Sequence, residues 1–144
     1  MSISDVLRGK GRQVVKVRTT DTIQAAVRKL ADQRIGAVVV EDAWMKPAGI
    51  FSERDFVNAM AEYGAQALSF RVERLMSAPL VTCRPVDSVE TALAAMTMAK
   101  IRHLPVEEGG QLIGIVSIGD LVKHRLDEKA LEANVLLDIA RLHA

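Results

Sequence analysis

The chain has 144 residues, of which 49% are hydrophobic and 26% are charged, a composition expected of an ordinary globular protein rather than a disordered chain. This length allows one compact domain or two half-domains that share a core, and it excludes a multidomain enzyme. Nineteen Lys and Arg side chains balance eighteen Asp and Glu, and the formal net charge of +1 argues against duplex DNA or another polyanion as the main partner.

Internal repetition is the strongest feature of the sequence. The segment DTIQAAVRKL at 21–30 recurs as DSVETALAAM at 87–96, and GIFSERDFV at 49–57 recurs as GIVSIGDLV at 114–122. Two copies of one unit therefore fill most of the chain.

A short amphipathic lead-in comes before each copy, since ISDVL at 3–7 resembles VERLM at 72–76. We expect three regions: a first repeat with its lead-in at 1–70, a second repeat at 71–125 and a C-terminal amphipathic helix at 126–144.

Both copies predict the same order of elements, because runs of β-branched residues alternate with apolar residues at helical spacing. The first copy predicts a strand at 14–17, a helix from 23, strands at 37–40 and 48–51, and a second helix. The second copy predicts a strand at 80–83, a helix from 89, strands at 103–106 and 111–117, and a second helix. The order is β-α-β-β-α, twice.

This order predicts the fold class. A three-stranded sheet with two helices on one side leaves its other face apolar, and a copy of about 60 residues would be marginally stable alone. The second copy can cover that face. We therefore predict an α/β (α+β) fold of two pseudo-twofold-related β-α-β-β-α repeats, with facing sheets and a central cleft that offers two related pockets.

The segment after each third strand reads Ser-x-x-Asp, at 52–55 and 117–120. In one interpretation the serine caps the helix and the aspartate returns a capping-box bond, together contributing about 1–2 kcal/mol. In the other, the helix N-terminus meets a phosphate and the aspartate accepts the hydroxyls of a ribose diol. The two interpretations are compatible and both stay open.

The repeated motifs at 49–57 and 114–122, with IRHLPV at 101–106, resemble the paired cystathionine-β-synthase-type (CBS) domains called a Bateman module. The resemblance spans about residues 3 to 124. It implies a disc-like module that binds an adenosine-containing ligand, such as AMP, ADP, ATP, NAD or S-adenosylmethionine, in the cleft between the repeats, usually as a sensor.

The resemblance implies one well-equipped pocket around Asp120, which would hold the ribose hydroxyls. Basic residues would meet phosphate, although a histidine such as His103, taken by itself, is more often a surface or strand-end residue than a ligand contact. The implied ligand-binding residues are Thr20, Ala25, Arg102, His103, Ser117, Ile118, Gly119 and Asp120.

A second and weaker pocket is implied around Asp55. Its residues would be Gly36, Ala37, Ser52, Arg54, Asp55 and Val86. Val86 stands where the first pocket has Thr20, and two small residues stand where it has Arg102 and His103, so fewer polar groups would hold a ligand. Arg54 restores some positive charge.

No residue pattern indicates catalysis or a metal site. His124 and His143 lack the spacing of metal ligands, and no order of Ser, His and Asp suggests a catalytic triad. We expect no catalytic residues, no metal and no required cofactor, with an adenine nucleotide as a regulatory ligand only.

The C-terminal segment places Leu131, Val135, Leu136, Ile139 and Leu142 on one face of a helix, with charges opposite. This face either packs against the rest of the chain or extends a homodimer seam, and the sequence leaves both interpretations open.

The expected compartment is the cytoplasm. Cys83 is the only cysteine, so no intrachain disulfide is possible. No stretch approaches about 18 uninterrupted apolar residues, and we expect no membrane association.

The first hypothesis is a non-enzymatic adenine-nucleotide sensor that forms a homodimer and regulates another protein. AMP is favoured because one basic cluster suits a monophosphate better than a triphosphate. The alternative is a protein-interaction or assembly module whose pockets stay empty. Nucleic acid is an unlikely partner because few aromatic side chains are present for base stacking.

Overall fold

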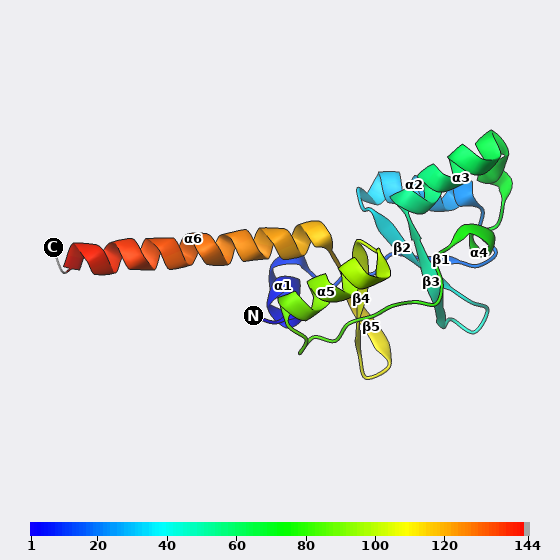
Figure 1. The fold of residues 1–144 in the computed structure, drawn as a ribbon. Coiled ribbons are helices and arrows are strands. Elements are labelled where there is room, and N and C mark those ends of the chain that lie inside the picture. The colour runs from blue at the N-terminus through cyan, green and yellow to red at the C-terminus, as the bar shows by residue number, and fades with distance from the viewer. Residues whose placement is uncertain (143–144) are drawn as a thin grey trace.

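The computed structural model describes residues 1–142, in two halves of similar architecture followed by a long helix (Figure 1). The elements are α1 (Ile3–Lys10), β1 (Lys16–Arg18), α2 (Ile23–Gln33), β2 (Ala37–Glu41), β3 (Pro47–Ser52), α3 (Glu53–Tyr63), the 3-10 helix η1 (Gly64–Ser69), α4 (Val72–Leu75), α5 (Val89–Ala99), β4 (His103–Glu108), β5 (Gln111–Ser117) and α6 (Ile118–Leu142). His143 lies outside the described residues.

The first half is built on a three-stranded sheet in which β1 runs parallel and β3 antiparallel to the central strand β2. The strands are rich in β-branched residues, and Val38, Val40 and Phe51 are completely buried. Helix α2 begins as predicted, because the hydroxyl of Thr22 accepts a hydrogen bond of 3.1 Å from the amide of Ala25.

The second half repeats this plan with one strand fewer. Strands β4 and β5 pair antiparallel, but the strand predicted at 80–83 is reduced to one parallel bridge between Cys83 and Val106. In the first half the amide of Val39 donates a 3.0 Å hydrogen bond to a carbonyl just before β1. Pro105 stands at the equivalent position and has no amide hydrogen, so this bond cannot form and the ladder stays short.

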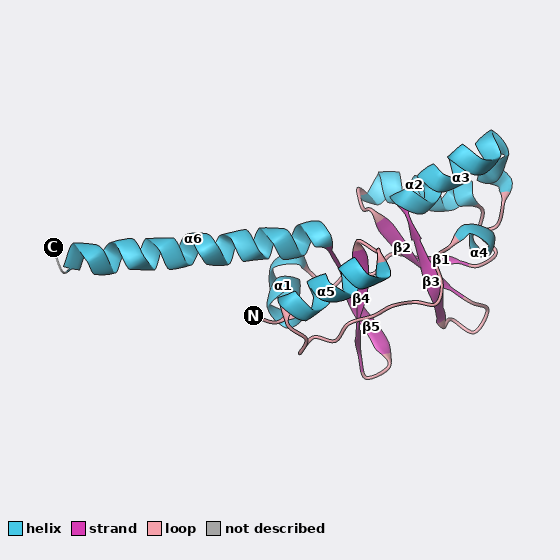
Figure 2. Ribbon diagram, in the orientation of Figure 1, coloured by secondary structure: helices cyan, strands magenta, loops and turns pink. Residues whose placement is uncertain are grey.

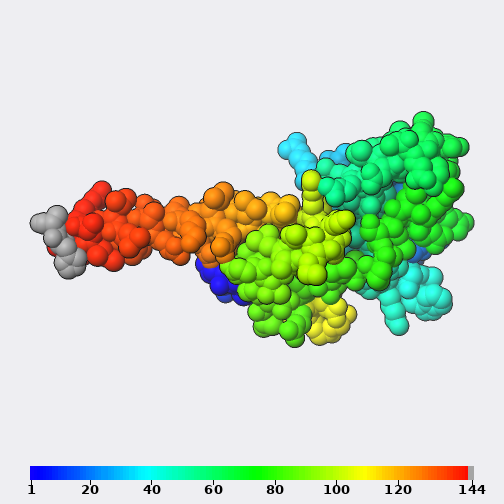
Figure 3. Space-filling view, in the orientation of Figure 1, coloured from blue at the N-terminus to red at the C-terminus, as the bar shows by residue number. Residues whose placement is uncertain are grey.

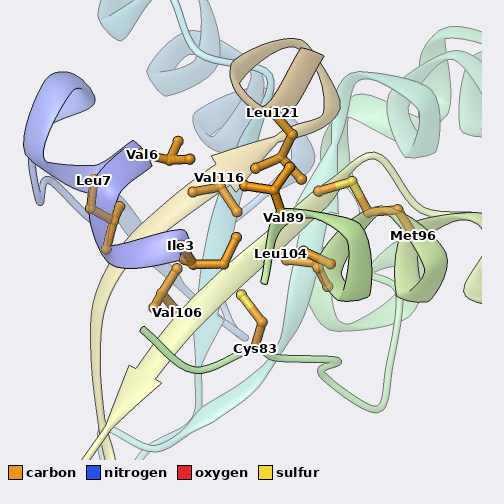
Figure 4. Close-up of a cluster of buried hydrophobic side chains, with 11 residues drawn as sticks. Ile3, Val6, Leu7, Cys83, Val89, Met96, Leu104, Val106, Val116 and Leu121 are labelled. Atoms are coloured by element: carbon orange, nitrogen blue, oxygen red, sulfur yellow. The ribbon is translucent and has the colours of Figure 1, made fainter. Parts of the chain in front are cut away.

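The two lead-in helices are exchanged between the halves. Helix α1 precedes the first half in sequence, yet Ile3 and Leu7 are buried in the core of the second half (Figure 4). Helix α4 precedes the second half and buries Val72 in the core of the first. Equivalent backbone bonds fix both helices: the amide of Ile3 donates to Asp87 at 2.9 Å, and that of Val72 to Asp21 at 2.8 Å. The halves are thereby joined through their cores.

These contacts explain the glycine that opens each repeated GI-x-S motif. A Cβ atom on Gly114 would lie 2.8 Å from Cδ2 of Leu7 in α1. A Cβ atom on Gly49 would lie 2.6 Å from the carbonyl oxygen of Ser77, just after α4. Each lead-in therefore approaches a strand more closely than a side chain would allow.

The strands lie toward the middle of the molecule, with α2 and α3 beyond the first sheet and α1 and α5 beyond β4–β5 (Figure 2). Residues from both halves line cavities between them. The predicted fold class of two related α+β repeats is confirmed.

Helix α6 is a continuous helix of 25 residues that extends away from the two halves (Figures 1 and 3). Its counterpart α3 ends at Gly64, which adopts a φ of 68°. Lys129 stands at the equivalent position in α6, and the helix continues. Every residue from 129 to 142 is exposed. The segment predicted as a separate C-terminal helix at 126–144 is helical over its described residues, but it continues the helix that begins at Ile118. The interpretation that it packs against the rest of the chain is wrong.

Candidate functional site

Each Ser-x-x-Asp motif forms the first turn of a helix at the cleft. In α3 the amide of Ser52 donates to the Asp55 carboxylate at 2.9 Å, and the amide of Asp55 donates back to the Ser52 hydroxyl at 3.3 Å. In α6 the corresponding distances between Ser117 and Asp120 are 2.8 and 3.1 Å. Both motifs are reciprocal capping boxes, so the capping interpretation is confirmed. Their role toward a ligand stays a prediction.

The two carboxylates differ in their second partner. Asp55 accepts a hydrogen bond of 2.9 Å from the hydroxyl of Ser77, which follows α4. Asp120 accepts one of 2.5 Å from the ammonium of Lys10, the last residue of α1. Both partners come from the exchanged lead-in segments, but one is neutral and the other is charged.

The charged partner fixes the ionisation of Asp120. Burial raises the pKa of this carboxyl, but hydrogen bonds from the Lys10 ammonium and the Ser117 amide outweigh burial, and the pKa lies below its usual value. Asp120 is therefore ionised at neutral pH and forms an ion pair with Lys10.

One cavity opens around Asp55 and has a volume of about 170 Å³. The first half contributes the α3 N-terminus, and the second half contributes the start of β4. The polar residues that line this Asp55 pocket are Ser52, Glu53, Arg54, Asp55, Ser77, Lys100, Arg102 and His103.

A second cavity opens around Asp120 and has a volume of about 430 Å³. It combines the α6 N-terminus with the start of β2 and with the segment that follows α1. The residues of this Asp120 pocket that bear on its chemistry are Lys10, Gln13, Arg34, Gly36, Ala37, Ser117 and Asp120.

Glu53 and His103 line both pockets and form the wall between them. A Cβ atom on Gly36 would lie 2.7 Å from Nε2 of His103 and 3.2 Å from Oε1 of Glu53, so the glycine leaves room for the imidazole. Burial lowers the pKa of His103, and the positive charge of Lys10 lowers it further. His103 is therefore neutral at physiological pH.

The structure groups the predicted residues differently from the sequence analysis. Arg102 lies in the pocket of Asp55, whereas Gly36 and Ala37 lie in the pocket of Asp120. Each pocket joins a helix N-terminus of one half to the strand start of the other half. The sequence analysis assigned residues of the same copy to the same pocket. In the structure the pseudo-twofold arrangement brings together residues from different copies.

Some predicted residues lie away from both cavities. Thr20, Ala25 and Val86 are exposed and do not line either pocket. Ile118 and Gly119 are exposed in the first turn of α6, beside the Asp120 pocket.

Other lining residues were missed by sequence reasoning, namely Lys10, Arg34, Glu53, Ser77 and Lys100. Lys10 and Ser77 reach the pockets only because the lead-in helices are exchanged, which single-sequence patterns do not reveal. Arg34 and Lys100 had a usable signal, since they occupy equivalent positions, each three residues before a strand, β2 and β4 respectively.

Residues 1–142 contain neither a metal cluster nor a membrane-spanning helix. No group of three or more His, Cys, Asp or Glu side chains there is placed to hold a metal ion. No helix in the same residues is long and apolar enough to span a bilayer.

Comparison with known proteins identifies the family. The sequence profile of the CBS domain matches residues 3–62 and 72–127. A CBS domain-containing protein of Arabidopsis thaliana, named as mitochondrial, is 34% identical and is aligned over 93% of this chain and 71% of its own.

Solved structures agree with this match. The crystal structure of a CBS-domain containing protein from Agrobacterium tumefaciens has a TM-score of 0.83 at 44% identity, covering 86% of this chain and 92% of that one. A CBS domain protein from Pyrobaculum aerophilum, solved in complex with AMP, has a TM-score of 0.73 at 29% identity, covering 83% and 89%. The chain therefore belongs to the CBS domain family, and its two halves are a pair of CBS domains.

Proposed function

We propose that this CBS pair is a non-catalytic regulatory module that binds an adenosine-containing ligand between its halves. The observation that carries the proposal is the placement of Asp55 and Asp120, two equivalent carboxylates at helix N-termini, each lining a cavity between the halves. The AMP complex of the Pyrobaculum aerophilum protein supports an adenine nucleotide as the class of ligand.

The chemistry of both sites suits a nucleotide. A carboxylate can accept hydrogen bonds from both hydroxyls of a ribose, and the adjoining helix N-terminus favours a phosphate. In the Asp55 pocket Arg54, Lys100 and Arg102 add positive charge, while Glu53 at the inner wall opposes a long phosphate chain. This balance favours AMP over ATP.

A bound ligand would act by changing the relative orientation of the two halves, because it contacts both. It can shift that orientation only if it binds one arrangement more tightly than the other. We propose that the output is regulation of a partner protein, with the cytoplasm as the compartment.

Native mass spectrometry of the purified protein tests the proposal, first as isolated and then with AMP, ATP, NAD and S-adenosylmethionine. We expect an adenosine ligand to bind and to raise the melting temperature, with AMP the most effective. The double variant Asp55→Asn, Asp120→Asn should lose this stabilisation, measured against its own ligand-free melting temperature, which loss of the Lys10–Asp120 ion pair lowers while asparagine retains a capping oxygen. Equal stabilisation of the double variant, or binding of none of the four compounds, would contradict the proposal.

One observation favours the second candidate, an assembly module. Beyond residue 128 helix α6 touches no other part of the described chain, and Leu131, Leu136 and Leu142 are 64%, 67% and 83% exposed. An isolated helical segment of this length is marginally stable in water, and its apolar stripe must be covered to persist.

We propose that the stripe is covered by a second copy of this chain, which forms a homodimer. Side chains of both signs occur along this segment, including Glu128, Lys129, Asp138 and Arg141, so two copies can pair without a surface of one sign. Light scattering coupled to size-exclusion chromatography should show a dimer for the wild type. The variant Leu131→Gln, Val135→Gln, Leu142→Gln should be monomeric, whereas Ala133→Gln, Leu137→Gln, Ala140→Gln, on the opposite face of the exposed helix, should not. A monomeric wild type, or a dimeric apolar-face variant, would exclude this seam.

A further inference from the structure

Each ligand pocket contains an aspartate carboxylate that belongs to the capping box of a helix. A different side chain donates a further hydrogen bond to this carboxylate in each pocket. Ser77 donates to Oδ1 of Asp55 at 2.9 Å, and Lys10 donates to Oδ2 of Asp120 at 2.5 Å. The ammonium of Lys10 also donates to the carbonyl of Ile115 at 2.7 Å. The Asp120 carboxylate is therefore covered by the Lys10 ammonium, which is itself held by two hydrogen bonds.

The position of Lys10 is fixed by the exchange of the lead-in helices. Helix α1 is anchored in the core of the second half by Ile3 and Leu7, and it ends at Gly11, whose φ is 100°. Lys10 is the last residue of this helix, before its C-cap Gly11. The position of its backbone relative to Asp120 is therefore fixed by the buried side chains of α1 and not by a loop. An incoming ribose has to displace Lys10 to reach the carboxylate.

We propose that Lys10 competes with the ligand for Asp120, so that the Asp55 pocket is the high-affinity site for phosphorylated adenosine ligands and the Asp120 pocket is held closed against them. This inference rests on the proposed function, and it reverses the order of the two pockets expected from the sequence.

The free energy needed to displace the hydrogen-bond donor from the carboxylate differs between the two pockets. At Asp55 a ribose hydroxyl replaces a neutral serine hydroxyl. At Asp120 it replaces an ammonium, which makes the stronger, charge-assisted hydrogen bond and would lose its ion-pair partner. The lowered pKa of Asp120 has the same physical origin, since Lys10 stabilises the ionised carboxylate.

The positive charge available to a phosphate also favours the Asp55 pocket. Arg54, Lys100 and Arg102 are exposed at its edge and free of ion pairs within the described chain. In the Asp120 pocket one of the two cations is Lys10 itself, which Asp120 already neutralises. Size alone would give the opposite order, because the Asp120 cavity is the larger one. The lysine therefore decides which pocket fills first.

Calorimetric titration with AMP, read together with native mass spectra for stoichiometry, tests the proposal. For the wild type we expect one tight site, which Asp55→Asn weakens at least tenfold and Asp120→Asn leaves within threefold. In Lys10→Met, which keeps the apolar stem and removes the charge, the second site should tighten about tenfold, so that the two dissociation constants converge. Lys46→Met, a matched loss of one charge in an exposed loop, should change neither constant.

Three results would overturn the proposal: two equal sites in the wild type, loss of the tight site in Asp120→Asn, or a weaker second site in Lys10→Met, which would make Lys10 a ligand contact. A circular dichroism spectrum and melting temperature for each variant exclude misfolding as the cause. Failure of the proposed function would look different, because neither the wild type nor Lys10→Met would bind any adenosine ligand.

Discussion

The two CBS domains of this chain agree in their cores and differ where they face each other. Val38 and Leu104 occupy equivalent strand positions and are both fully buried. At the strand starts, however, Ala37 of the first domain lines only the Asp120 pocket, whereas its counterpart His103 in the second domain lines both pockets. Core positions in both domains face the same packing constraint, whereas positions that line a cavity can carry different side chains. A duplicated scaffold can thus hold two unlike pockets.

The largest expected effect comes from breaking the exchange of lead-in helices. Leu7→Ala should lower the free energy of unfolding by about 2–5 kcal/mol, because the side chain is 1% exposed in the core of the second domain. Urea denaturation measures this loss. Met98→Ala, on α5 with a side chain that is 87% exposed, is the control and should stay within about 0.5 kcal/mol. Equal effects of the two substitutions would mean that α1 does not stabilise the second domain.

A smaller effect should separate the two glycines that admit the lead-ins. Gly49→Ala should destabilise by about 1–3 kcal/mol, because the added methyl meets a backbone carbonyl that cannot move alone. Gly114→Ala should cost less, since the methyl meets the flexible end of the Leu7 side chain. The same denaturation assay compares them, and a larger cost at Gly114 would contradict this account of the contacts.

Restoring the missing strand of the second domain should change stability only slightly. Pro105→Val supplies an amide that can donate toward residue 81, worth about 0.5–1.5 kcal/mol, but it also removes the proline's restriction of the unfolded chain, worth about 0.4–1 kcal/mol. Hydrogen exchange is the sharper measurement. The new amide at 105 should be protected as strongly as that of Val39, and exchange at the rate of an exposed loop would show that proline is not what shortens the ladder.

The smallest effect is a pH dependence present in one domain only. Burial and then the charge of Lys10 lower the pKa of His103 below its unfolded value near 6.5, so the folded state disfavours protonation. Its contribution to stability is complete above that value and is lost as the pH falls through it toward the folded pKa. Melting temperatures at pH 7.5 and 5.5 should differ less for His103→Gln than for the wild type, and an equal difference would exclude His103 as the cause.

The sequence predicted most elements because the two copies support one another. The apolar spacing of Ile23, Ala26 and Leu30 has a counterpart in the second copy, and so do the helix caps at Thr22 and Ser88. Local signals of this kind depend on propensity and periodicity, which a linear chain displays. The prediction of a strand at 80–83 was wrong because it also used only local signals. The residues at 80–83 favour an extended backbone, but Pro105, which lacks the amide hydrogen needed for pairing, lies on the neighbouring strand.

The candidate site was predictable in its parts and not in their grouping. The Ser-x-x-Asp motif occurs twice and predicted Ser52, Asp55, Ser117 and Asp120. Each copy of the motif starts a helix at the cleft. Which basic residues face which carboxylate depends on how the halves meet. Arg102 is close to Ser117 in sequence, yet it lines the pocket of Asp55.

The sequence by itself determined a duplicated α+β unit, its helix caps and the amphipathic character of its last helix, because each of these depends on residues within a few positions of one another. Tertiary structure alone decided that α1 packs on the second domain, that Lys10 thereby reaches Asp120 and that Glu53 and His103 separate the two pockets. These are contacts across as many as 110 residues, fixed by the burial of apolar side chains from both copies in shared cores.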